Sequence, residues 1–353
     1  MKTFIFVTFL ALSNSIFAQK LKLKIDGSNA IKSFQYLSSE KKSDVEVGYI
    51  LNLPGTIGML NHDGQFDKQL NRENFIREIT DTTASTNAFR FKQIRKDLTS
   101  IQATISLMTD SIAIITNRIE SNLIPFSNQL KTKSINVYFV LGGNSDGYAT
   151  DDSTFFLELQ FFGDDIEGII NIVTHEIYHI IQQRNFEQIN KISSRLSAAD
   201  KATFLIARNI YLEGSATYVA NALTIPNPKK YALFQQEKFE RNLARIKESF
   251  YLFDALLMKA GSKNADGDLL YNIGYGGEWD SPLYFVGFVI CSTIENKYGK
   301  YYIKKYLTAS PIRLLLDYIY LYKKNSDIKY RFSTETEIII FNLQKTLTKM
   351  GYR

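Results

Sequence analysis

A short stretch of the chain carries residue types that can hold a metal ion and move a proton. Residues 174–179 read Thr-His-Glu-Ile-Tyr-His, so His175 and His179 are four positions apart and Glu176 follows the first. On a helix, residues four apart lie about 40° apart around the axis, so both imidazoles would project from one face toward one ion. Glu176 would lie about 100° around the axis from His175, within reach of a metal-bound water without being a ligand. The pattern predicts metal-assisted hydrolysis.

Chance is the alternative explanation of this pattern. A helix can carry two unrelated histidines around a salt-bridged glutamate. The chain has only three histidines, however, and two of them stand at this spacing. We therefore interpret the stretch as a metal site, and we look for the rest of its ligands.

A catalytic zinc has three protein ligands and an open fourth position, so two histidines are not enough. Residues 180–184, which follow His179, contain no histidine, and the third ligand must come from elsewhere. The stretch 211–218, Tyr-Leu-Glu-Gly-Ser-Ala-Thr-Tyr, resembles the second signature of the gluzincins. In these metallopeptidases a glutamate on a second helix completes a site of two histidines and one glutamate.

The resemblance implies that Glu213 is the third zinc ligand. Gly214 and Ala216 are small, and we expect them to let this second helix approach the motif helix closely enough for the carboxylate to reach the ion. A carboxylate on a helix surface or at a helix N-cap is the alternative for Glu213.

Three stretches also resemble uncharacterised bacterial families of zinc-dependent peptidases. They are residues 135–183, 206–219 and 282–299, and from the first to the last they span roughly half of the chain. The sequence departs from the gluzincin pattern in two respects. The motif and Glu213 are separated by a long segment, and Leu212 stands where the aminopeptidase branch often has Asn, so the resemblance leaves open whether cleavage is endo or exo.

Hydrolysis of an amide also needs a donor that stabilises charge on the carbonyl oxygen. No histidine follows His179, so we look among the tyrosines. We favour Tyr284, because it opens a predicted helix just after the glycine-rich segment 267–280. The other candidates are Tyr218, Tyr271 and Tyr275. A tyrosine packed in the core is the alternative for each.

The N-terminus has the pattern of a signal peptide. Lys2 supplies a positive charge, residues 4–12 are almost wholly apolar, and residues 13–18 are mostly small. The apolar run is too short to span a bilayer as a stable helix. We therefore predict cleavage after Ala18 and export to a periplasm or the cell exterior, with no stable membrane span afterwards. An uncleaved anchor or a buried strand is the alternative.

The periodicity of the chain predicts the elements around the motif. We expect strands at 45–53, 135–141 and 154–162, a loop at 61–64 that holds His62, and a long amphipathic helix at 91–119. The motif helix is expected at 166–183. Residues 163–165 end the preceding strand and could cap the motif helix. Further helices are expected at 198–223, 228–260, 281–298, 310–323 and 334–350, and a loop at 267–280.

These elements predict an α+β fold that is mostly helical. By resemblance it is zincin-like, with a small sheet packed on the metal-binding helix. We expect one peptidase domain at 19–353, with an N-terminal helical part at about 19–130 and a catalytic part at about 131–353. The length of 353 residues is enough for a large core. The one cysteine, Cys291, excludes an intramolecular disulfide and reads as a small core residue.

The predicted function is that of an exported zinc-dependent metallopeptidase acting on peptides or proteins, with Glu176 as general base. The alternative is an exported helical binding or scaffold protein whose metal site is structural or vestigial. A zinc hydrolase of non-peptide amides is a third candidate. The net charge of +6 is spread through the chain without basic runs, which argues against a nucleic-acid partner.

Overall fold

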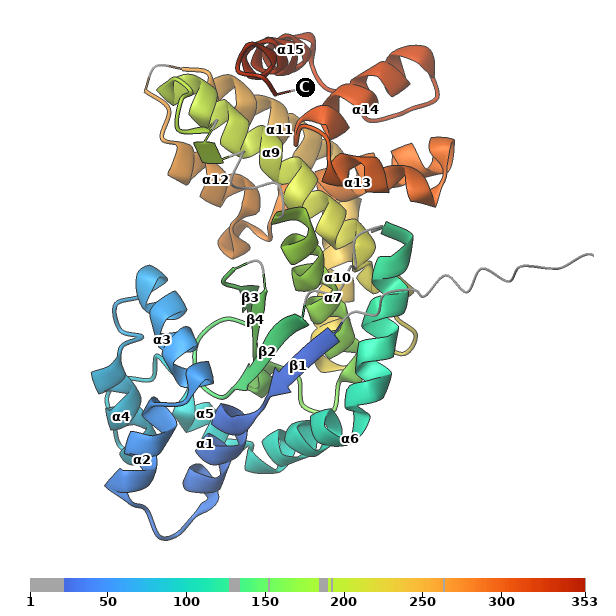
Figure 1. The fold of residues 1–353 in the computed structure, drawn as a ribbon. Coiled ribbons are helices and arrows are strands. Elements are labelled where there is room, and N and C mark those ends of the chain that lie inside the picture. The colour runs from blue at the N-terminus through green and yellow to red at the C-terminus, as the bar shows by residue number, and fades with distance from the viewer. Residues whose placement is uncertain are drawn as a thin grey trace, which may run out of the picture.

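A four-stranded sheet surrounded by helices organises the described part of the chain (Figure 1). The computed structural model describes residues 22–126, 134–151, 153–183, 190–191, 193–262 and 264–352. The expected signal peptide and the expected boundary near residue 130 lie outside these ranges. Within them helices predominate over the one small sheet, so the predicted α+β, mostly helical class is confirmed.

The sheet has the strand order β1-β2-β4-β3. Strands β1 (Lys22–Asp26), β2 (Ser134–Val140) and β4 (Thr154–Glu158) are parallel, and β3 (Gly147–Ala149) runs antiparallel to β4 at the edge. The predicted strand at 154–162 is too long, because the chain turns into a short 3-10 helix, η2 (Leu159–Phe161). Strands β1 and β3 were not predicted from the sequence, because they are too short to show a clear alternation.

The N-terminal part is more helical than expected. Its helices are α1 (Ser28–Ser38), α2 (Asp44–Leu51), α3 (Pro54–Phe66), α4 (Arg72–Thr80) and α5 (Phe91–Lys96). The predicted strand at 45–53 is wrong, because Ser43 caps α2 at the Val45 N–H and Val47, Ile50 and Leu51 are buried at helical spacing.

The predicted loop at 61–64 is also wrong, because these residues continue α3. His62 therefore lies on a helix, and its ring packs against the edge strand β3. Its ring stacks on Tyr148 with centroids 3.7 Å apart, and its Nδ1 lies 2.8 Å from Asp63 Oδ1.

Helix α6 (Leu98–Leu123) confirms the long amphipathic helix, although a break at Asp97 separates it from α5. Its buried residues keep the predicted spacing of three and four, and it ends at η1 (Ile124–Phe126), which contains Pro125. By length and composition alone, Leu98–Phe126 could cross a membrane. Its apolar stripe instead packs within the protein, chiefly on α7 and α1.

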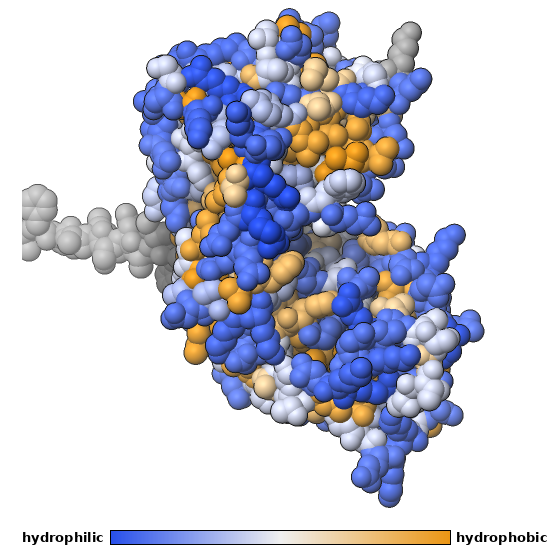
Figure 2. Space-filling model, turned by 180° about the vertical axis from the view of Figure 1, so that it is seen from behind, coloured by the Kyte–Doolittle hydropathy of each residue, from blue (hydrophilic) through white to orange (hydrophobic). Residues whose placement is uncertain are grey.

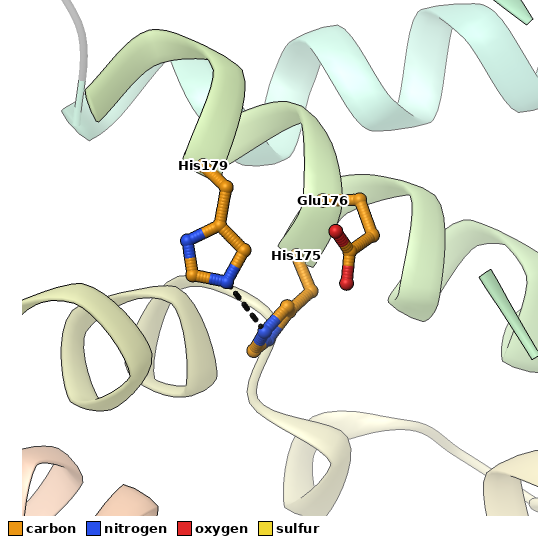
Figure 3. A group of neighbouring side chains, drawn as sticks. All are labelled: His175, Glu176 and His179. Atoms are coloured by element: carbon orange, nitrogen blue, oxygen red, sulfur yellow. Dashed lines mark hydrogen bonds between the residues drawn. The ribbon is translucent and has the colours of Figure 1, made fainter. Parts of the chain in front are cut away.

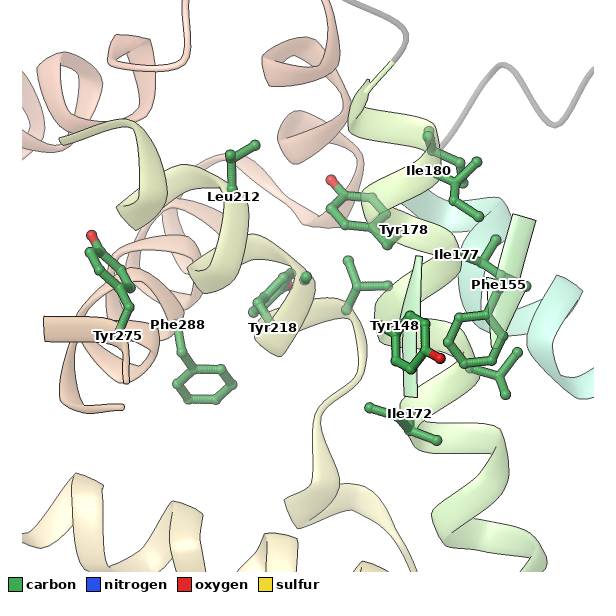
Figure 4. Close-up of a cluster of buried hydrophobic side chains, with 14 of the residues drawn as sticks. Tyr148, Phe155, Ile172, Ile177, Tyr178, Ile180, Leu212, Tyr218, Tyr275 and Phe288 are labelled. Carbon is green, nitrogen blue, oxygen red and sulfur yellow. The ribbon is translucent and has the colours of Figure 1, made fainter. Parts of the chain in front are cut away.

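The motif helix, α7 (Ile166–Gln183), has the predicted bounds. The carboxylate of Asp165 fixes its start, since Oδ1 accepts from the Gly168 N–H at 2.9 Å. The other oxygen accepts from the Ala232 N–H at 2.7 Å, at the start of α10 (Lys230–Ala244). One buried carboxylate therefore ties the beginnings of two helices together. Figure 4 shows Ile177 near Phe155 of the sheet, and Tyr178 on the side of α7 that faces Leu212.

The remaining helices form the upper half of Figure 1. They are α9 (Ala198–Val219), α11 (Ile246–Ala260), α12 (Gly267–Tyr275), α13 (Pro282–Tyr298), α14 (Arg313–Lys324) and α15 (Thr334–Lys349). The predicted helix at 228–260 is divided at Arg245 into α10 and α11. The predicted loop at 267–280 holds helix α12, which Asp266 caps, and the short 3-10 helix η4 (Gly277–Trp279).

Helices α9 and α13 cross at backbone contact. A Cβ added to Gly214 would lie 2.3 Å from the Gly287 Cα, and a Cβ added to Gly287 would lie 2.3 Å from the Ile210 carbonyl oxygen. The expectation that Gly214 lets α9 approach the motif helix is therefore wrong. This glycine admits α13 instead, which packs on the opposite side of α9 and fixes the helix that carries Glu213.

A buried pair of carboxyl groups joins α3 to the end of β4. Glu158 and Asp63 are 0% and 2% exposed, and Glu158 Oε1 and Asp63 Oδ2 have no other hydrogen-bond partner. Both oxygens meet at Gly143, where a Cβ would lie 2.3 and 2.7 Å from them. Burial and the nearby Asp63 charge raise the pKa of Glu158 well above its ordinary value. A proton between the two groups accounts for their contact.

The crossing at Gly214 generates a stability prediction. We expect Gly214→Ala to lower the free energy of unfolding by about 1–3 kcal/mol, because a methyl group has no room between the two backbones. Urea unfolding measures this. The matched control is Gly48→Ala within α2, where nothing lies within 4 Å of an added Cβ. It should be neutral or up to about 1 kcal/mol stabilising. Equal stability of the two variants would contradict the packing argument.

The carboxyl pair generates a pH prediction. Above pH 4.5, the ordinary pKa, the unfolded chain loses the Glu158 proton while the folded protein keeps it. The free energy of unfolding contributed by this group is therefore complete below that pH and falls as pH rises toward the folded pKa, by up to about 1.4 kcal/mol per pH unit. Glu158→Gln should remove this fall, as urea unfolding between pH 5 and pH 8 would reveal. The exposed Glu240→Gln serves as control, and an unchanged slope in Glu158→Gln would refute the assignment.

Candidate active site

Three side chains from two helices converge on one point. His175 and His179 project from the same side of α7, with Nε2 atoms 3.1 Å apart (Figure 3). Glu213, on α9, brings its Oε2 to 3.2 Å from the His179 Nε2 and 3.6 Å from the His175 Nε2. The tertiary structure thus brings together the three residues that the sequence singled out as ligands.

The spacing and chemistry of these donors fit a zinc ion. Two ligands of a tetrahedral zinc, each about 2.0–2.1 Å from the ion, are separated by about 3.3 Å. The three measured separations, 3.1, 3.2 and 3.6 Å, bracket that value. Glu176 also comes within 4.8 Å of both histidines. The geometry of Glu213 fits the third position better, because its oxygen lies within ion-pair distance of both imidazoles.

Gln182 orients His179 and links α7 to α9. Its Oε1 accepts from the His179 Nδ1 at 2.7 Å, and its Nε2 donates to the Leu212 carbonyl at 3.1 Å and the Ser215 hydroxyl at 2.8 Å. The Leu212 carbonyl can only accept a hydrogen bond, so the Gln182 amide must turn its NH2 group toward Leu212 and its oxygen toward His179. The proton on Nδ1 then leaves Nε2 free as a ligand. Thr217, one turn beyond Glu213 on α9, does not take this role, because its hydroxyl has no hydrogen-bond partner among the described residues.

The charges at the convergence point favour a cation. Burial alone would raise the pKa of Glu213, but the charge and hydrogen bonds of the two histidines hold that pKa well below its usual range. Burial works against a charged His179, yet Glu213 outweighs it and raises the His179 pKa to about 9. Burial lowers the pKa of His175. A buried carboxylate here therefore requires a positive neighbour, either a proton on His179 or a metal ion.

Glu176 lies next to His175 on the motif helix, within 4.8 Å of both histidines. Figure 3 shows its carboxylate on a different side of α7 from the two facing imidazoles. Burial raises its pKa to about 8, against the opposing effects of His179 and of the Ala149 backbone on β3. A carboxyl group with a pKa near neutrality can both take up and release a proton.

Tyr284, at the start of α13, also reaches the site. Its ring is parallel to that of His175, at a centroid distance of 6.3 Å and an angle of 8°. Burial and the adjacent Glu213 raise the pKa of its hydroxyl well above the ordinary value. Two other tyrosine candidates are engaged elsewhere. Tyr275 donates to the Ile206 carbonyl at 2.6 Å, and Tyr218 donates to Glu295.

A polar cleft of about 330 Å³ opens beside these groups. Its walls come from the β3 edge, α7, α9, α10 and the start of α13. They include three polar residues that the sequence analysis did not single out, Asp146, Tyr231 and Lys238. Figure 2 shows the surface indented between the C-terminal helices and the N-terminal part. Another cavity, of about 380 Å³, lies mainly between α13 and α14, and none of the proposed site residues lines it.

The contact of Gln182 with His179 could have been predicted from the sequence, because Gln182 follows His179 by three positions and so lies on the same face of the helix. The cleft residues had no such signal, since Tyr231 and Lys238 sit on a helix far from the motif in sequence. The Tyr231 hydroxyl donates to Asp146, which also accepts from the Gly147 N–H at 2.9 Å. This contact connects α10 to the loop before the edge strand.

Comparison with known proteins agrees with the geometry. Residues 49–327 match the family model described as "Putative zinc dependent peptidase (DUF5700)". No curated protein and no solved structure matches the chain. The matched range contains His175, His179 and Glu213, together with Glu176 and Tyr284. Since the match covers well over half of the chain, the chain belongs to the DUF5700 family, which is described as zinc dependent.

Proposed function

We propose that this protein is a metallopeptidase that uses one zinc ion to hydrolyse peptide bonds. The convergence of His175, His179 and Glu213 beside an open polar cleft carries the proposal. Structural zinc sites close with four protein ligands. Here the described residues supply three, and the cleft borders the site. This arrangement favours catalysis over the alternative of a scaffold with a structural metal.

The three ligands would hold the ion in the same arrangement that they adopt around their common point. When bound, zinc supplies Lewis acidity, which acidifies water and polarises a carbonyl group. Glu213 would contribute the negative charge and Gln182 would hold His179 in the tautomer that ligation needs.

Glu176 would be the general base. Its carboxylate would take a proton from the attacking water and return it to the leaving amine, which is the use that a proton affinity near neutrality allows. Tyr284 would donate a hydrogen bond to the carbonyl oxygen as negative charge develops on it, because its ring stands beside His175.

The free edge of β3 would align a peptide substrate. Hydrogen bonds from Thr150 N–H to Thr154 and from Glu158 N–H to Asp146 show which residues pair with β4. By alternation, the backbone carbonyl groups of Gly147 and Ala149 point away from β4, toward the cleft side, whereas the Gly147 N–H is already bonded to Asp146. An extended peptide can add to such an edge through main-chain hydrogen bonds. This feature supports a peptide substrate over a small non-peptide amide.

The catalytic proposal predicts separate effects for two variants. Glu176→Gln should keep one bound zinc and lose at least about 100-fold in activity, because the carboxylate moves protons without holding the ion. Glu213→Gln should lose zinc, because it removes the only charged ligand. Casein hydrolysis measures the activity, and elemental analysis after dialysis measures the metal.

The exposed Glu240→Gln is the control for both variants and should match the wild type. Full activity in Glu176→Gln would exclude the proposed base. A wild type that binds no zinc at neutral pH would exclude the metallopeptidase and favour the scaffold alternative.

We further propose that the protein is exported, from the pattern of residues 1–18. The N-terminus of the mature protein recovered from a periplasmic or culture fraction should be Gln19, because Ala18 ends the small-residue stretch. Edman sequencing determines it. Recovery of the protein from the cytoplasm with Met1 intact would contradict export.

A further inference from the structure

The cleft contains one lysine that forms no ion pair with any acidic residue in the described part of the chain. Lys238, on α10, is the only lysine or arginine among the described residues that line the cleft. Its Nζ donates to the Ser281 hydroxyl at 3.3 Å. Among the described residues, no carboxylate lies within ion-pair distance of this ammonium group. An ammonium group has three donors, so Lys238 retains capacity for an anion.

The acids around the cleft already have partners. Asp280 forms ion pairs with Arg245 at 2.8 Å and Arg241 at 3.4 Å. Asp146 accepts from Tyr231, and Glu213 faces the two motif histidines. Partial burial lowers the pKa of Lys238, which shows that its charge is held at a cost. A carboxylate brought by a ligand would offset this cost.

Thr217 provides a second, independent indication of a ligand. Its side chain lines the same cleft from α9 and is only 5% exposed, yet within the described ranges its hydroxyl has no hydrogen-bond partner. Buried polar atoms normally have a partner. A polar group of a bound substrate is the partner that the cleft can admit.

Lys238 lies within a short peptide's reach of the zinc ligands. Its Nζ is 5.7 Å from the centre of the Tyr284 ring, which is 6.3 Å from the centre of the His175 ring. The ammonium group is therefore at most about 12 Å from His175, a distance that three to four residues of extended chain cover. A carboxylate on Lys238 would thus belong to a residue near the cleaved bond.

We propose that Lys238 forms a specificity subsite that binds a carboxylate of the substrate within about four residues of the scissile bond. This rests on the proposed peptidase function. The carboxylate is either the C-terminus of a short peptide or the side chain of an internal Asp or Glu. The shared chemistry is a charge-assisted hydrogen bond from the ammonium group, which strengthens binding without entering the reaction.

Binding can be measured apart from cleavage in the zinc-loaded Glu176→Gln background. The only tryptophan, Trp279, is 58% exposed in η4, two residues after the cleft residue Gly277. Its fluorescence reports the titration. The probes are N-acetylated alanine pentapeptides with a free C-terminus, with a C-terminal amide, and with an amide plus one internal Glu or Gln. We expect a carboxylate peptide to bind about tenfold more tightly than its amide isostere.

Adding Lys238→Met should abolish this tenfold preference, and adding Lys238→Arg should retain part of it. Lys247→Met, an exposed lysine on α11, should leave it intact. Preference for the free C-terminus alone identifies the chain end as the ligand. Preference for internal Glu alone identifies a side chain. Equal binding of carboxylate and amide peptides, or failure of all peptides to bind, would overturn the subsite.

Peptide cleavage is measured in the protein that keeps Glu176. Its kinetics distinguish a binding subsite from a catalytic role for Lys238. Lys238→Met should raise KM for carboxylate peptides about tenfold and leave kcat and the amide substrates unchanged. An equal fall of kcat on both substrate types would overturn the subsite. If the wild type cleaves nothing but Lys238-dependent carboxylate binding persists, the proposed function fails and the subsite stands. If it cleaves both types equally, the function stands and the subsite fails.

Discussion

A carboxylate buried between two imidazoles is the interaction on which this site depends. Glu213 lies close to both histidines, with its side chain 14% exposed. A buried charge of this kind is costly without a positive neighbour, so the cluster is stable only with a proton or a cation at its centre. The same arrangement therefore favours a positive charge at the point where the three side chains meet.

Two contacts keep that carboxylate in position. Gln182 joins the motif helix to α9 through His179 on one side and the Leu212 carbonyl on the other. On the far side of α9, the backbone contact between Gly214 and Gly287 fixes the position of α13 relative to α9. Tyr284 at the start of α13 lines the cleft. The helix that carries Glu213 is thus fixed from both sides, and the ligand geometry follows from helix packing.

The cleft adds polarity that the ligands do not provide. Its walls bring together α10, α13 and the loop before β3, and the hydrogen bond from Tyr231 to Asp146 holds two of these elements together. Lys238 forms no ion pair with the described acidic residues and donates only to the Ser281 hydroxyl, so it retains capacity for a negative group. The point where the three side chains meet lies between α7 and α9, whereas Lys238 stands on α10.

The sequence predicted the motif helix, both central strands and the three side chains that converge in the structure, His175, His179 and Glu213. Their signals are local, because a spacing of four residues places two histidines on one face and alternation marks a buried strand. The sequence misassigned residues 45–53, since branched residues at helical spacing in a short segment suit both helix and strand. It also assigned Gly214 to the wrong neighbour, because a small residue shows that something approaches closely but not which element.

Three features became visible only in the tertiary structure. They are the contact of Gln182 with His179, the residues that line the cleft, and the position of the edge strand β3. These features join segments such as β3, α10 and the Gly214–Gly287 crossing, which are far apart in the chain or too short to show a pattern. Contacts of this kind arise when separate helices pack, and no local spacing encodes them. The chemistry of the site was therefore readable from residue types, whereas its selectivity depends on how the helices meet.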